Sequence, residues 1–136
     1  PEVRWETVTA PDGTLLHGRL MLPLGFDAGR RYPLIVHVYG GPHAQRVRKH
    51  WPGEDALDQW LARHGFLVWS LDNRGSWGRG HAFETPVDRH LGEQELADQL
   101  AGVEWLRTLP FVDVDRLGIT GWSYGGYMTL QALVHA

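Results

Sequence analysis

With 136 residues, the chain is long enough for one small domain and too short for a multidomain assembly. Hydrophobic residues make up 43% of it and seven tryptophans offer large surfaces to bury, so we expect an ordered core and exclude intrinsic disorder. The formal net charge of -3 argues against a dedicated binder of nucleic acid or of an anionic membrane.

Several classes of site are excluded by what the chain lacks. Cysteine is absent, so there is no disulfide, no Cys-ligated metal centre and no cysteine nucleophile. No apolar run approaches the roughly 20 residues of a membrane-spanning helix. The first residues carry neither a Met nor a signal-peptide pattern, so we expect the chain to be part of a longer protein. Its compartment stays open between cytoplasmic and periplasmic or secreted.

The first third of the chain predicts β-structure. Residues 3–9 and 15–22 are two apolar-alternating runs separated by the turn signal Pro11-Asp12-Gly13, which is the pattern of a β-hairpin. Residues 33–39 are apolar nearly throughout, which is typical of a strand covered on both faces.

Helices and strands are expected to alternate after residue 39. Residues 54–64 and 93–109 have helical spacing, and the second range has an apolar stripe formed by Leu96, Leu100, Val103 and Leu106. Short apolar runs at 66–71 and 117–120 predict strands, and the chain is helical in character from Tyr124 onward. This order predicts an α/β fold with a mostly parallel sheet and helices on both faces. The long polar stretch 72–92 is either functional or packs against a partner outside this chain.

A pattern of the type Gly-x-Ser-x-Gly lies where the last predicted strand gives way to the last predicted helix. It is formed by Gly121, Ser123 and Gly125, in the context typical of a nucleophile elbow. On so tight a turn, the strand and helix backbones approach too closely for a β-carbon two residues before or after the serine. The helix that follows favours the negative charge that develops during attack. Ser123 is therefore the candidate nucleophile.

Two tyrosines are candidates for an oxyanion hole. Such a hole takes one N–H from the residue after the nucleophile, here Tyr124, and a second donor from a Gly-rich loop after an earlier strand. The sequence Gly-Gly-Pro at 40–42 follows the predicted strand 33–39, and the phenol of Tyr39 is the candidate second donor. The alternative for Tyr39 is a packing role at the sheet edge, with a routine turn after it.

The acid and base of a catalytic triad are not found after the serine. In α/β-hydrolases both follow the nucleophile along the chain, yet residues 124–136 hold no acid. His135 would lie roughly 18 Å further along a helix, too far to be the base. We therefore expect this chain to lack two members of its own triad. The histidines match no metal-ligand spacing, so no metal is expected.

Four motifs occur in a particular order. They lie at residues 38–45, 72–76, 89–92 with Glu95, Asp98 and Gln99 behind it, and 121–127. Together they resemble the catalytic domain of the prolyl oligopeptidase family of serine peptidases, in its dipeptidyl peptidase IV and prolyl tripeptidyl peptidase branch. The resemblance covers nearly the whole chain.

The resemblance implies that residues 1–136 are the N-terminal portion of an incomplete α/β-hydrolase fold. A β-propeller would precede it, and a C-terminal part would supply the triad Asp and His and most of the P1 pocket. The implied activity is that of a serine exopeptidase that releases short N-terminal peptides after Pro or Ala without a cofactor. Ser123 would be the nucleophile, and the Tyr39 hydroxyl and Tyr124 N–H the oxyanion donors. The Tyr124 ring would border the P1 pocket.

Other functions stay open. The chain by itself is expected to be inactive and to expose an apolar face. A carboxylesterase or acylaminoacyl peptidase on the same fold is one alternative, and a noncatalytic scaffold fragment is another. The resemblance leaves open whether dipeptides or tripeptides are released and whether the longer protein is a homo-oligomer.

Overall fold

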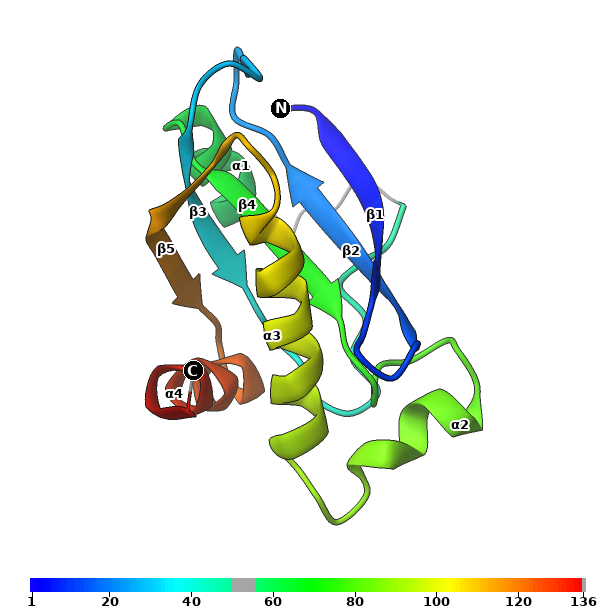
Figure 1. Cartoon of the computed structure of the whole chain (residues 1–136). Coiled ribbons are helices and arrows are strands. Elements are labelled where there is room, and N and C mark those ends of the chain that lie inside the picture. The colour runs from blue at the N-terminus through cyan, green and yellow to red at the C-terminus, as the bar shows by residue number, and fades with distance from the viewer. Residues whose placement is uncertain (50–55, 136) are drawn as a thin grey trace.

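A computed structural model describes residues 1–49 and 56–135 of the chain (Figure 1). Within these ranges one sheet has five strands in the order β1-β2-β4-β3-β5. The strands are β1 (Val3–Thr9), β2 (Leu15–Met21), β3 (Tyr32–His37), β4 (Leu67–Asp72) and β5 (Val112–Thr120). The helices are α1 (Ala56–Arg63), α2 (His81–Glu84), the 3-10 turn η2 (Thr85–Val87), α3 (Glu93–Arg107) and α4 (Tyr124–His135).

The first two strands form the predicted hairpin. β1 and β2 pair antiparallel, with Val3 opposite Met21 and Thr9 opposite Leu15. Gly13 has a φ of 87°, the left-handed conformation that the turn requires and that glycine adopts without steric cost. The Ala10 N–H closes the turn on the Thr14 carbonyl at 2.8 Å. The sequence prediction for residues 3–22 is therefore confirmed.

The sheet is mixed, so the prediction of a mostly parallel sheet holds for β3, β4 and β5 and not for the pairings of β2. β3 runs parallel to its neighbours β4 and β5, whereas β2 pairs antiparallel with both β1 and β4. The strand and helix alternation predicted the parallel part correctly, since a crossover between parallel strands carries a helix. The hairpin places β2 between β1 and β4, and β2 runs opposite to both; the tight turn requires this direction only for the pairing with β1.

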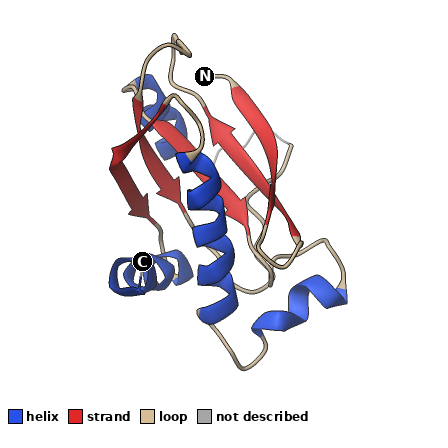
Figure 2. Cartoon of the chain, in the orientation of Figure 1, coloured by secondary structure: helices blue, strands red, loops and turns tan. Residues whose placement is uncertain are grey.

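Helices cover both faces of the sheet, as predicted (Figure 2). On one face, Leu61 and Ala62 of α1 pack against Met21 and Val68. On the other, Leu106 of α3 and Met128 of α4 join the larger core, whose other fully buried members are Leu16, Leu20, Leu22, Leu34, Leu67 and Trp69. The predicted start of the first helix, at 54–55, lies outside the described residues.

Coverage of the central strands differs from the prediction. β4 is buried at every residue, but β3 alternates: Tyr32, Leu34 and Val36 are buried and the residues between them are half-buried. β3 also ends at His37 rather than Tyr39. Ile35 points to the face under α1, where the apolar cluster is the smaller of the two. That face of β3 is covered by one helix, α1, and is therefore less completely buried than the opposite face, which α3 and α4 cover.

The predicted apolar stripe of α3 packs in the larger core through Leu96, Val103 and Leu106, but the most deeply buried residues of the helix are mostly polar. Its most deeply buried residues are Glu95, Asp98, Gln99, Gly102 and Leu106. Of the predicted stripe, only Leu106 is fully buried, and the other three members are half-buried. Buried polar groups persist only where their hydrogen bonds are made, so this face must have specific partners. None of the described helices is long and apolar enough to cross a membrane.

Candidate active site

Ser123 lies on the sharp turn between β5 and α4. Its φ is 56°, in the left-handed region that a residue with a β-carbon seldom adopts. The turn is held by the Gly125 N–H, which donates to the Trp122 carbonyl at 2.8 Å, and by the Gly126 N–H, which donates to the Ser123 carbonyl at 2.9 Å. The Ser123 side chain is exposed. Such strain is maintained where the surrounding structure enforces it, and it is frequent at active sites.

The two glycines that flank Ser123 are required by close backbone contacts. A β-carbon at Gly121 would lie 2.4 Å from the Gly125 carbonyl oxygen and 2.6 Å from that of Val38. One at Gly125 would lie 2.2 Å from the Val38 oxygen. The obstacles are main-chain atoms, which cannot swing aside. The end of β3 therefore presses against the turn, as the spacing of the motif led us to expect.

Tyr39 and Tyr124 are brought together beside this turn. Their ring centroids are 6.3 Å apart and the rings are tilted by 37°. Gly41 lies between them, since a β-carbon there would be 2.8 Å from Tyr39 Cε1 and 3.0 Å from Tyr124 Cγ. As the first residue of α4, Tyr124 has a main-chain N–H that no residue of the helix can accept. Tyr39 faces an open cavity of about 370 Å³, which is also lined by His43 and Trp77.

Glu95 of α3 reaches the Tyr124 ring. The Tyr124 hydroxyl donates to Glu95 Oε1 at 2.7 Å, and the Gly92 N–H donates to Glu95 Oε2 at 2.9 Å. Burial, followed by the hydrogen bond to Glu95, raises the pKa of the Tyr124 phenol above its ordinary value. Tyr124 therefore donates its phenol hydrogen to the buried Glu95 side chain, and its ring is held at both ends.

Gln99, one turn further along α3, is connected to the Tyr39 loop through Asn73. Gln99 Nε2 donates to Asn73 Oδ1 at 2.8 Å and to the Leu71 carbonyl at 3.1 Å. Asn73 Nδ2 donates in turn to the Gly40 carbonyl at 3.0 Å. Sequence reasoning assigned no role to Asn73, Gln99 or Glu95. The signal that could have found them is the i, i+4 spacing of Glu95 and Gln99, which puts two polar groups on one helix face.

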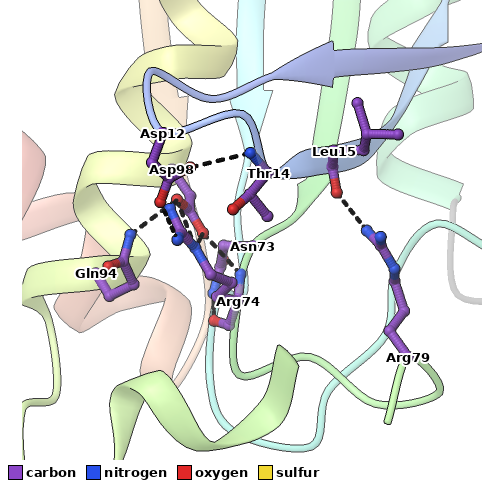
Figure 3. Close-up of polar contacts among 8 residues, drawn as sticks. All are labelled: Asp12, Thr14, Leu15, Asn73, Arg74, Arg79, Gln94 and Asp98. Atoms are coloured by element: carbon purple, nitrogen blue, oxygen red, sulfur yellow. Dashed lines mark hydrogen bonds and ion pairs between the residues drawn. The ribbon is translucent and has the colours of Figure 1, made fainter. Parts of the chain in front are cut away.

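Arg74 and Asp98 anchor the start of the long segment 72–92 (Figure 3). Arg74 Nη2 lies 2.6 Å from Asp98 Oδ1, and the Arg74 N–H donates to Asp98 Oδ2 at 2.8 Å. Arg74 also pairs with Asp12 in the turn of the β1–β2 hairpin. The segment, the hairpin and α3 are thereby connected at one point, next to Asn73. Whether the rest of this segment binds a partner stays a prediction.

The position of the acid and base that would activate Ser123 stays a prediction. His135 is the last residue of α4, exposed and at the opposite end of that helix from Ser123. No histidine or carboxylate among the described residues forms a hydrogen bond with the Ser123 hydroxyl. No group of three or more histidine and acidic side chains in the described ranges is arranged to hold a metal ion.

Comparison with known proteins gives a consistent result. The family model described as "Prolyl oligopeptidase family" matches residues 54–136. Human dipeptidyl peptidase 8 is 40% identical over 124 residues, which cover 90% of this chain and 14% of that protein.

Solved structures are similar as well. A crystal structure from Bacteroides ovatus, assigned as a dipeptidyl aminopeptidase IV, matches with a TM-score of 0.93 and 47% identity over 98% of this chain and 19% of that one. Porphyromonas gingivalis dipeptidyl peptidase 4 matches with a TM-score of 0.90 and 33% identity over the same shares. The chain spans less than a fifth of the length of the curated relatives that it matches.

Proposed function

Because the chain belongs to the prolyl oligopeptidase family, we propose that it is the nucleophile-bearing part of a serine exopeptidase. In this proposal, residues 1–136 form the N-terminal portion of an α/β-hydrolase domain within a longer protein. The single observation that supports it best is the turn at Ser123. A strained, exposed serine held by glycines at both sides of the turn suits a nucleophile and has no evident structural use.

The proposed reaction is acyl transfer in two steps. Ser123 Oγ attacks the carbonyl carbon of the scissile peptide bond, and a base outside this chain takes the hydroxyl proton. Tyr39, through its hydroxyl, and Tyr124, through its main-chain N–H, stabilise the oxyanion of the tetrahedral intermediate. The amine leaves with a proton returned from the base. Water then attacks the acyl-enzyme by the same route and releases the N-terminal peptide.

The proposed substrate is a peptide with a free amino terminus. Relatives named dipeptidyl peptidase 4 and 8 support the release of a dipeptide, and the family resemblance supports Pro or Ala at P1. The ring of Tyr124 would border the P1 pocket. We place the triad acid and base, the remaining pocket residues and the groups that bind the substrate amine outside this chain. The isolated chain is therefore expected to be inactive.

The test is labelling with a fluorophosphonate probe, followed by mass spectrometry, on the full-length protein and on this chain. We expect the full-length protein to be modified at Ser123, a Ser123→Ala variant to be unmodified, and the isolated chain to react at a far lower rate. Absence of labelling in a correctly folded full-length protein would overturn the proposal and favour a noncatalytic scaffold.

A second experiment separates the peptidase from related hydrolases. Gly-Pro-p-nitroanilide, its N-acetylated form and p-nitrophenyl acetate are offered to the unlabelled full-length protein. Turnover of the free-amine peptide with loss of activity on the acetylated form supports an exopeptidase. Preference for the acetylated peptide indicates an acylaminoacyl peptidase, and turnover of the ester alone indicates a carboxylesterase.

A further inference from the structure

α3 presents two buried polar side chains, Glu95 and Gln99, toward the two tyrosines of the proposed oxyanion hole. They lie one helical turn apart and so project from the same face of the helix. Both residues are buried, with 0% of the Glu95 surface and 4% of the Gln99 surface exposed to solvent. Burial of polar groups is unfavourable unless they are hydrogen-bonded, so the partners of these residues indicate what this face does.

The Gln99 side chain has a fixed orientation. Both of its amide N–H groups are used, one on Asn73 Oδ1 and one on the Leu71 carbonyl at the end of β4. If the Gln99 amide were rotated by half a turn, its oxygen would face Asn73 Oδ1 and the Leu71 carbonyl, which are themselves acceptors, and both hydrogen bonds would be lost. Gln99 therefore holds the Asn73 side chain against a rigid element of the sheet.

Asn73 transmits this constraint to the Tyr39 loop. It is fully buried, and its two amide N–H groups donate to the Gly40 carbonyl and, at 2.6 Å, to the Arg74 carbonyl. Gly40 has a φ of 76° and is followed by a second glycine, so this loop has little intrinsic stiffness. The Asn73 hydrogen bond holds the carbonyl of the residue that directly follows Tyr39.

Glu95 does the same for the second tyrosine. Its two carboxylate oxygens bind the Tyr124 hydroxyl and the Gly92 N–H at the start of α3. The bond to Tyr124 fixes the far end of a ring whose near end is mounted on the Ser123 turn. Since the Tyr124 and Tyr39 rings are neighbours, with centroids 6.3 Å apart, Glu95 and Gln99 of α3 support adjacent side chains.

We infer that Gln99, acting through Asn73, is a positioning residue for the Tyr39 hydroxyl, and that Glu95 is a positioning residue for the Tyr124 ring. The inference rests on the proposed function. It adds that Gln99, Asn73 and Glu95, which do not contact substrate, hold in place the two tyrosines that do. An oxyanion donor is effective only within hydrogen-bond distance of the developing charge. A loop that drifts by about 1 Å is enough to reduce turnover by about 10- to 100-fold.

The main test is a double-mutant cycle in the full-length protein, read by kcat and KM on Gly-Pro-p-nitroanilide. Tyr39→Phe is expected to lower kcat by about 100- to 1,000-fold because it removes an oxyanion donor. Gln99→Met is expected to lower kcat by about 10- to 100-fold with little change in KM. In the Tyr39→Phe background, Gln99→Met should have almost no effect, because the hydroxyl that Gln99 positions is already gone.

A matched control and a second variant keep the test independent of folding defects. Gln94 is on the same helix and bonds Asp98 at 3.0 Å, so Gln94→Met should leave kcat unchanged. Asn73→Ala should reproduce Gln99→Met. If Gln99→Met lowers kcat equally with and without the Tyr39 hydroxyl, the effect is structural and the inference is wrong.

Hydrogen exchange gives a readout that does not need activity. In Gln99→Met, amides of the peptide that contains residues 39–45 should exchange faster, while those of the β1–β2 hairpin should be unchanged. Unchanged exchange in 39–45 would overturn the inference even in an inactive protein. Activity that persists in Ser123→Ala would instead overturn the proposed function, so the two failures are distinguishable.

The role proposed for Glu95 is tested separately, through its hydrogen bond with the Tyr124 hydroxyl. Tyr124→Phe keeps the main-chain N–H and removes only the hydroxyl that Glu95 binds. We expect Tyr124→Phe and Glu95→Gln each to raise KM for the Pro substrate several-fold more than for an Ala substrate, and the double variant to be no worse than either. Additive losses in kcat with unchanged Pro to Ala preference would overturn this part of the inference.

Discussion

Alanine substitutions at two adjacent glycines of α4, Gly125 and Gly126, are expected to have opposite effects on the turn at Ser123. Gly125 would place a β-carbon 2.2 Å from the Val38 carbonyl oxygen and 3.2 Å from Tyr39 Cα. At Gly126, the next residue, the nearest atom outside its own helical turns is the Gly121 carbonyl oxygen, 3.7 Å from such a β-carbon, which is an ordinary contact. The two substitutions add the same methyl group one residue apart and so form a matched pair.

The magnitudes follow from these distances. Normal contact between carbon and oxygen is more than 3 Å, so Gly125→Ala must push the end of β3 away from α4 by about 1 Å. Overpacking in a filled core costs about 1 to 3 kcal/mol, and a main-chain obstacle puts this variant at or above the upper end. Gly126→Ala should stabilise the protein by up to about 1 kcal/mol, because alanine favours the helix over glycine.

The assay combines urea unfolding, followed by tryptophan fluorescence, with fluorophosphonate labelling of the full-length protein. Gly125→Ala should lower the unfolding midpoint and abolish labelling at Ser123, since the shifted strand carries Tyr39 with it. Gly126→Ala should leave labelling intact and raise the midpoint or leave it unchanged. Normal labelling and stability in Gly125→Ala would refute the claim that close approach of the backbones dictates the motif.

Three further predictions concern the rest of the molecule. Asp58→Ala removes the carboxylate 2.6 Å from the buried Arg19 and should destabilise the protein by about 3 to 5 kcal/mol in the same urea assay. A cost below about 1 kcal/mol would contradict the expectation that the buried guanidinium depends on this carboxylate. The hydrogen bond from Arg74 lowers the pKa of Asp12 to about 2, so the stability that ionised Asp12 contributes is nearly complete above pH 4 and is lost as the pH falls through 2. Asp12→Asn should be less stable than wild type at pH 5, and the difference between their melting temperatures should shrink steadily as the pH is lowered to 2; a difference that does not change with pH would refute this pairing. Leu133 is 69% exposed on α4, and Leu133→Gln should reduce self-association of the isolated chain in size-exclusion chromatography, unless that chain is already a monomer at all concentrations.

Local patterns predicted most of the secondary structure. The hairpin, the buried β4 and the helix after Ser123 each depend on residues close in sequence, and the structure has all three. The orientation of β2 against β4 could not be read in this way, because pairing between distant strands leaves no local signal. A pattern of alternating strands and helices predicts which strands are parallel, because a helix connects them. It does not predict how strands added at the edge of the sheet are oriented.

The residues of the candidate site also fall into two groups, those that the local sequence predicts and those whose role depends on contacts between distant segments. Gly121 and Gly125 are predictable because a backbone contact excludes every other side chain there, and the measured distances agree. Tyr39 was found through its place after a strand and before two glycines. Asn73 and Gln99 belonged to the motifs behind the family resemblance but were given no role, since the hydrogen bonds from Gln99 to Asn73 and from Asn73 to the Gly40 carbonyl exist only in the folded chain.

α3 shows why a polar helix face can be worth its burial. A wholly apolar face would pack on the sheet without constraining the loops above it, because apolar contacts have no preferred direction. Hydrogen bonds from Gln99 and Glu95 fix direction as well as distance, and each ends beside a tyrosine of the proposed oxyanion hole. Asp98 adds the anchor for Arg74 from the same face. The helix that appeared from its leucines to be a packing element is, in its buried residues, the support on which the loops of the site rest.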